Sequence, residues 1–113
     1  MNTINVANDF YFRLVNRNKY QGDGLHHAEE FRNKYLSDLD KIEAWSDDNE
    51  YILLDFKNVK KIGPSFANEA FAFFTKYAKP EQIFKKISFK NLTKVQDIII
   101  RTELEAGYSS YSS

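Results

Sequence analysis

Ser65 stands out chemically because it lies where a helix is expected to begin. It follows the break Gly63-Pro64 and precedes apolar residues at helical spacing. At a helix N-terminus, free backbone N–H groups and the helix dipole favour negative charge. The serine can therefore cap the helix, which contributes about 1 kcal/mol. If it is phosphorylated instead, it carries roughly two negative charges where the helix end tolerates them. Both interpretations stay open.

Two carboxylates on either side of Ser65, Asp55 and Glu69, form a pair that could serve general acid–base chemistry. Asp55 ends an apolar segment, so we expect it to accept hydrogen bonds from the loop that follows. Glu69 lies one turn into the helix, where it would either face a partner or contact the N–H groups of the loop. No cysteine or histidine nucleophile–base system accompanies them. We therefore expect no catalytic residues, and a protein that is not an enzyme.

Three lysines precede Ser65: Lys57, Lys60 and Lys61. Beside a helix N-terminus they could form a small anion site, for a nucleotide phosphate or for an acidic partner surface. A solvated lysine loop is the simpler interpretation. No glycine-rich phosphate-binding loop is present to favour a nucleotide, because no Gly-Lys-Ser/Thr follows Gly63.

Metal and disulfide chemistry are not expected. The 113 residues include no cysteine, which excludes disulfides and cysteine-based metal sites. His26 and His27 are neighbours, and adjacent helical residues point about 100° apart, so they cannot chelate one metal as an i, i+4 pair would. We expect both histidines on the surface near a helix start, and neither a metal nor another cofactor.

Charge and hydropathy point to a globular domain. The 16 basic and 16 acidic residues balance, so the chain lacks the electrostatic footprint of a nucleic-acid-binding protein. Acidic residues gather in 38–50, opposite Lys85, Lys86, Lys90 and Lys94, which predicts a dipolar surface. No apolar run approaches a membrane span of about 20 residues, and the N-terminus does not resemble a signal peptide. We expect a cytoplasmic location and no membrane partner.

Alternating strands and helices are expected to position these residues. A continuous apolar run at 51–56 predicts a strand buried on both faces. Asp23 is the expected cap of the first long helix, and Pro80 is expected to end the second. The expected elements are strands at 4–6 and 10–15 (a hairpin is one option), a helix at 25–42, a strand at 51–56, a helix at 65–78, a strand at 83–89 and a helix at 92–102.

This order predicts the α/β class: a single domain at residues 1–107 with a small mixed or parallel sheet and helices packed mainly on one face. Ten phenylalanines and seven tyrosines predict a core filled largely by aromatic rings. Residues 108–113, rich in serine and tyrosine, are expected to form a flexible C-terminal tail.

One block of the sequence resembles STAS domains, best known from bacterial anti-sigma factor antagonists, and more closely the STAS-like domains of unknown function. Their signature is Leu-Asp-Phe, two residues, Val, and then a Ser-Phe-Ala-x-Glu helix start. The matching residues here are Leu54, Asp55, Phe56, Val59, Ser65, Phe66, Ala67, Asn68 and Glu69. The resemblance extends over roughly residues 17–105, where Arg17 and Gly22 resemble a recurrent Arg and Gly.

The resemblance implies a regulatory protein–protein interaction module, whose partner is a histidine-kinase-like ATPase or an anti-sigma-type kinase. It places Ser65 where the antagonists carry their phosphorylated serine. The neighbours differ: Gly63-Pro64 replaces an acidic residue before the serine, and Phe66 replaces a small residue after it. The residues expected to contact the partner are Lys57, Lys60, Lys61, Ser65, Phe66, Asn68 and Glu69.

Two other functions stay open. A homodimer or larger homo-oligomer would form through exposed aromatic residues, for which the candidates are Tyr11, Phe73, Tyr77, Tyr108 and Tyr111. Alternatively, a small ligand or nucleotide would bind at the lysine-rich helix start.

Overall fold

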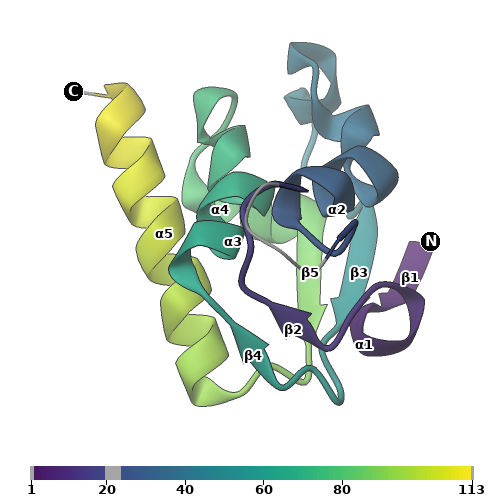
Figure 1. Ribbon diagram of the computed structural model, residues 1–113. Helices are drawn as coiled ribbons and strands as arrows, with labels where there is room; N and C mark the ends of the chain where they lie inside the picture. The colour runs from purple at the N-terminus through teal and green to yellow at the C-terminus, as the bar shows by residue number, and fades with distance from the viewer. Residues whose placement is uncertain (1, 20–23, 113) are drawn as a thin grey trace.

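The computed structural model describes residues 2–19 and 24–112, and it confirms the α/β class (Figure 1). The strands are β1 (Asn2–Asn5), β2 (Arg13–Leu14), β3 (Ile52–Asp55), β4 (Lys61–Ile62) and β5 (Ile87–Lys90). The α-helices are α1 (Val6–Asp9), α2 (Ala28–Tyr35), α3 (Pro64–Ala70), α4 (Pro80–Lys86) and α5 (Lys94–Ser112). Three 3₁₀ segments join them: η2 (Ser37–Leu39), η3 (Ile42–Trp45) and η4 (Ala72–Lys76).

All strand pairs in the described part of the chain are parallel. A three-stranded sheet has the order β1-β3-β5, and β2 pairs with β4 in a second, two-stranded sheet. The parallel alternative from the sequence is therefore confirmed. The hairpin between 4–6 and 10–15 is wrong, because α1 separates β1 from β2 and each strand pairs with a different, distant segment.

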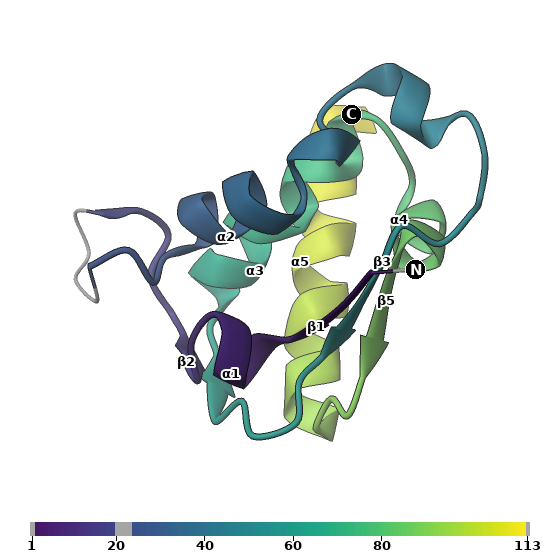
Figure 2. The same cartoon turned by 90° about the vertical axis from the view of Figure 1, so that its right-hand side faces the viewer.

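The larger helices pack on one face of the three-stranded sheet. Figure 2 shows α2, α3 and α5 together on one side of β1, β3 and β5. Burial in β3 alternates accordingly: Ile52 and Leu54 are buried, whereas Leu53 and Asp55 are only half-buried. The expectation that this strand is buried on both faces is therefore wrong, because helices cover it mainly from one side.

Aromatic rings fill much of the core, as the composition predicted. Phe31 of α2 makes edge contacts with Phe66 and Phe71, with ring centroids 5.7 and 6.0 Å apart. The fully buried phenylalanines are Phe31, Phe56, Phe66, Phe71 and Phe74. These contacts fix α3 against α2, and α3 also packs against α5.

The first long helix is shorter than expected. α2 begins after His27, whose Nδ1 accepts the Glu30 N–H at 3.1 Å. It ends at Tyr35, and within the rest of the expected range 25–42 only η2 and the first residue of η3 are helical. Asp23, the expected cap, lies outside the described residues, and the capping role belongs to His27. His27 is also buried, which corrects its expected surface position.

Proline begins the fourth helix instead of marking a stop. Pro80 is the first residue of α4, where its missing N–H costs no hydrogen bond and its fixed φ suits a helix. Residues 83–86, expected in a strand, therefore belong to α4, and β5 starts only at Ile87. The helix expected at 65–78 is divided into two segments, because α3 ends at Ala70 and the 3₁₀ segment η4 follows it.

The last helix begins at a capping box and continues through the expected tail. Thr93 Oγ1 accepts the Gln96 N–H at 3.1 Å, and Gln96 Oε1 accepts the Thr93 N–H at 2.9 Å. Gly107 packs closely on η4, so the helix is anchored beyond the expected boundary at residue 107. The helix continues as far as Ser112, through most of the residues expected to form a flexible tail. None of the helices in the described ranges has the length and apolar character needed to cross a bilayer.

Candidate functional site

Asp55 shapes the loop at the end of β3. Its Oδ1 accepts the Lys57 N–H at 2.9 Å and the Asn91 side-chain amide at 2.8 Å. The hydrogen bond from Asn91, followed by that from Lys57, lowers the pKa of Asp55 below its ordinary value. The expected loop-shaping role is confirmed. Asn58 and Asn91, both in the left-handed backbone region, form the turns on either side.

Two apolar residues of the motif anchor the lysine loop. Phe56 and Val59 are buried, and the Val59 N–H bonds the Phe56 carbonyl at 2.9 Å in a tight turn. The three lysines, Lys57, Lys60 and Lys61, are exposed around this anchor. The loop thus presents exposed cationic side chains from a backbone that the two buried residues anchor.

Ser65 is the second residue of α3 and not its cap. Gly63 holds the cap position, without a side-chain hydrogen bond, and Pro64 is the first helical residue. The capping interpretation of Ser65 is therefore wrong, and Ser65 is a half-buried residue in the first turn. Phe66 is fully buried, so it fixes the helix and offers no contact surface, contrary to its expected partner-binding role.

Arginines from two other segments hold Asn68 and Glu69. Arg17 Nη1 donates to Asn68 Oδ1 at 3.0 Å and to Glu69 Oε1 at 3.3 Å. Arg32 of α2 donates to Glu69 Oε2 and to the Glu69 carbonyl, the latter at 2.6 Å. Glu69 thus contacts arginines and not the loop N–H groups that were one expectation. Asp55 and Glu69 are held by separate partners, and the pKa of Asp55 is lowered, opposite to the raised pKa of a general acid.

Arg17, noted in the sequence for its resemblance to a recurrent arginine, contacts the motif helix, whereas Gly22 lies outside the described residues. The sequence did not point to Arg32. Its partner Glu69 is 37 residues away, so no local spacing connects them. Arg32 also lies over the Phe73 ring at 3.8 Å, and Lys76 lies over the same ring at 3.8 Å. Phe73 therefore contacts two cations, and each cation is stabilised by its interaction with the ring.

One side of α3 remains accessible after this packing. Its members are half-buried and recur three or four residues apart, which places them on one side of the helix. They are Ser65, Asn68 and Glu69, and we call them the α3 face. Two residues of this face, Asn68 and Glu69, border a pocket of about 370 Å³. Its other lining residues are Ala72, Phe73, Ala106, Gly107 and Ser110.

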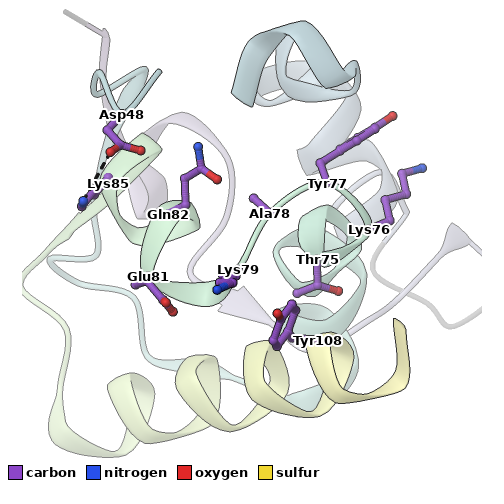
Figure 3. A pocket seen from close by; sticks show the side chains of 10 residues that line it. All are labelled: Asp48, Thr75, Lys76, Tyr77, Ala78, Lys79, Glu81, Gln82, Lys85 and Tyr108. Carbon is purple, nitrogen blue, oxygen red and sulfur yellow. Dashed lines mark hydrogen bonds and ion pairs between the residues drawn. The ribbon is translucent and has the colours of Figure 1, made fainter. Parts of the chain in front are cut away.

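A larger pocket, of about 670 Å³, lies between η4, α4 and the end of α5 (Figure 3). Tyr108 of α5 is on the opposite side from Gln82 and Lys85 of α4 in this view. Two lysines that line it are paired: Lys85 with Asp48 at 3.4 Å, and Lys76 with Asp40 at 3.6 Å.

The acidic segment 38–50 and the lysines are interleaved and do not form separate poles. Besides the Lys85–Asp48 pair, the buried Lys86 donates to Asp47 and lowers the pKa of that carboxyl. The predicted dipolar surface is thus corrected at these positions.

His26 stacks on Tyr11, with ring centroids 4.0 Å apart. The described residues hold no group of three or more His, Cys, Asp or Glu side chains placed to bind a metal.

The aromatic residues proposed for self-association are less exposed than expected. Tyr11, Phe73, Tyr77 and Tyr108 are all half-buried, and the side chain of Tyr111 lies outside those described. Tyr77, for example, donates its hydroxyl to Asp40 at 2.8 Å.

Comparison with known families identifies the motif region. The family described as a STAS-like domain of unknown function (DUF4325) matches residues 27–97, more than half of the chain. The match covers β3, β4, α3, α4 and β5, but not β1 or most of α5. No curated protein and no solved structure matches the chain.

Proposed function

The chain belongs to the family of STAS-like domains of unknown function, and from this membership we propose that it is a regulatory protein-binding module. Its contact surface is the α3 face together with the lysine loop at 57–61. The domain acts by binding and not by catalysis. The similarity of its motif to that of anti-sigma factor antagonists supports a kinase-like ATPase as the partner, in a bacterial cytoplasm.

The observation that carries this proposal is the contrast between the two sides of α3. Its inward residues Phe66, Ala67 and Ala70 have no exposed surface, so the helix cannot shift without disturbing the core. Its outward residues are polar, and two arginines hold Asn68 and Glu69 in place. A preorganised polar surface loses little side-chain entropy on binding, which favours recognition of a protein partner.

Ser65 is the proposed switch of this surface. Ser65 is half-buried at the start of α3, and its spacing of three and four residues places it on the same side of the helix as Asn68 and Glu69. A phosphate there would add negative charge to the centre of the contact surface, close to the exposed Lys60 and Lys61 in sequence. Because the buried side of α3 is unaffected, the change would alter partner binding without unfolding the domain.

Affinity capture from the native host tests the proposal. The bait is the wild-type domain, compared with Ser65→Glu and Asn68→Ala on the α3 face. Asn33→Ala on the exposed side of α2 is the matched control. We expect a kinase-like or ATPase protein that the wild type and the control recover equally and that both face variants lose. The proposal fails if no recovered protein depends on the α3 face.

Peptide mapping tests the switch separately. Trypsin cleavage at Lys61 and Lys76 gives a peptide whose only hydroxyl residues are Ser65 and Thr75, and Thr75 is buried. We expect a phosphate on Ser65 in protein purified from the host under at least one growth condition. An unmodified peptide under every condition would leave a constitutive binding module.

Small-ligand binding is the second candidate, because the 670 Å³ pocket is within the usual size range of ligand sites, about 300–1,000 Å³. The pocket is not at the lysine loop, where the sequence suggested a ligand. A thermal-shift screen with nucleotides and small metabolites tests it, with Thr75→Val and Tyr108→Ala as pocket variants. A melting temperature that no compound raises would remove this candidate.

A further inference from the structure

A line of five uncharged side chains runs along the solvent-exposed side of α5, beside the exposed charged residues Lys94, Arg101 and Glu105. Its members recur three or four residues apart and are all exposed: Val95, Ile98, Thr102, Ala106 and Ser109. Val95 is 65% exposed and Ile98 53%. Figure 1 shows α5 along the flank of the molecule, with no other element beyond it. We call these five residues the α5 stripe.

Such a stripe is unusual on a surface helix, which normally directs charged residues to solvent. The charged residues of α5 lie beside the stripe and not within it. One of them, Arg101, is paired with Asp97 at 3.0 Å and lies over the Phe84 ring at 4.5 Å, so it belongs to the side facing α4. Two large apolar side chains, one turn apart, are therefore left in water, and burying them would be favourable.

We propose that the α5 stripe is the contact surface of a homodimer. In this dimer α5 packs antiparallel against α5 of a second copy, about a two-fold axis near residues 99 and 100. This inference does not depend on the function proposed above. It also uses a different surface from the half-buried aromatic residues that the sequence suggested for self-association.

The occupant is a second copy because the stripe complements itself in size. In an antiparallel helix pair, residues equally far on either side of the axis face each other. With the axis between residues 99 and 100, Ile98 lies nearest to Thr102 of the partner, and Val95 lies between Thr102 and Ala106 of the partner. Each large side chain therefore meets a small one, and both copies make the same contacts.

Charges beside the stripe complement each other about the same axis. Lys94 and Glu105 are both exposed, and helical geometry places them on the same flank of the stripe. In an antiparallel pair, equivalent flanks of the two helices face each other, so Lys94 lies opposite Glu105 of the partner at both ends of the contact. Opposite charges at both ends favour the antiparallel arrangement and fix its register.

Sedimentation velocity over a concentration series of the purified chain tests the dimer. We expect a monomer–dimer equilibrium that Ile98→Glu abolishes. Ile42→Glu is the matched control, because Ile42 is the same residue type, is 60% exposed and lies outside α5. It should leave the association unchanged. Circular dichroism of each variant verifies that the fold is retained.

Charge exchange tests the antiparallel register. Lys94→Glu and Glu105→Lys should each weaken dimerisation by about tenfold, and the double variant should restore it. Both single changes suit the helix dipole, since one places an acid near the start of α5 and the other a base toward its end. A chain that is monomeric at every concentration, a dimer that survives Ile98→Glu, or a double variant that is not restored would overturn the proposal.

Discussion

Arg32 donates two hydrogen bonds to Glu69, one to the side-chain carboxylate and one to the backbone carbonyl. The side chain of Arg32 is 11% exposed and lies over the Phe73 ring. One arginine thereby connects α2 to α3 and to η4. This connection holds the α3 face in a fixed position relative to the rest of the domain.

Replacing Arg32 by lysine should therefore be costly. Lysine keeps the charge but cannot bind both oxygens and stack on the ring at once. We expect Arg32→Lys to lower the free energy of unfolding by about 1–2 kcal/mol, measured by urea denaturation. Arg101→Lys is the matched control, because Arg101 also pairs with an acid and stacks on a phenylalanine but is 59% exposed. Equal effects of the two changes would contradict the role given to Arg32.

Ser65 and Thr93 should respond in opposite ways to alanine. Ser65 is not the cap of α3, so Ser65→Ala should change the free energy of unfolding by less than about 0.5 kcal/mol. Thr93 bonds the Gln96 N–H at the start of α5, so Thr93→Ala should cost about 1 kcal/mol. Thermal and urea unfolding of both variants measure the difference. A loss at Ser65 as large as that at Thr93 would show that the serine does cap its helix.

Gly107 should not tolerate a methyl group. Glycine inside a helix normally gains about 0.5–1 kcal/mol on replacement by alanine. A Cβ at Gly107, however, would lie 3.0 Å from the Ala72 Cβ and 3.1 Å from Thr75 Oγ1, both in the buried η4. We expect Gly107→Ala to destabilise by about 1 kcal/mol or more. Ser109→Ala, on the exposed side of the same helix, should be neutral or slightly stabilising. A stabilised Gly107→Ala would mean that α5 can move away from η4 at little cost.

Acid should weaken the fold partly through Asp55. Hydrogen bonds from Asn91 and Lys57 place the folded-state pKa of Asp55 below its ordinary value of 3.8. The folded state therefore binds this proton less readily than the unfolded state, and the stabilisation is present above pH 3.8 and lost as the pH falls through the folded pKa. We expect the gap in unfolding free energy between wild type and Asp55→Asn to shrink in that acid range. Curves that stay parallel down to low pH would contradict the assigned hydrogen bonds.

The motif could be placed from the sequence because its signals are local. The apolar run before Asp55 predicts β3, and the spacing after Gly63-Pro64 predicts α3. Pro80 was misread as a stop because proline both follows helices and begins them, and only the next turn distinguishes the two cases. The capping box of Thr93 and Gln96 was a readable signal for the start of α5.

The remaining features depend on contacts between distant segments. Whether β1 forms a hairpin or pairs with β3 is decided by tertiary packing, which short apolar runs do not encode. The same holds for Arg32 and Glu69, and for Gly107 and Ala72, whose contacts join separate helices. The tail appeared flexible because serine and tyrosine are weak helix formers, but Gly107 anchors that part of α5 on η4.

Hydrogen–deuterium exchange of the domain, alone and bound to the protein captured by the wild-type bait, tests the central claim most directly. The amides of Ser65 and Phe66, in the first turn of α3, have no intrahelical partners, so they should exchange readily in the free domain. The account predicts slower exchange at residues 57–69 in the complex and little change around the pocket lined by Tyr108. Protection confined to that pocket or to α4, with residues 57–69 unchanged, would contradict the claim that partners bind at the α3 face.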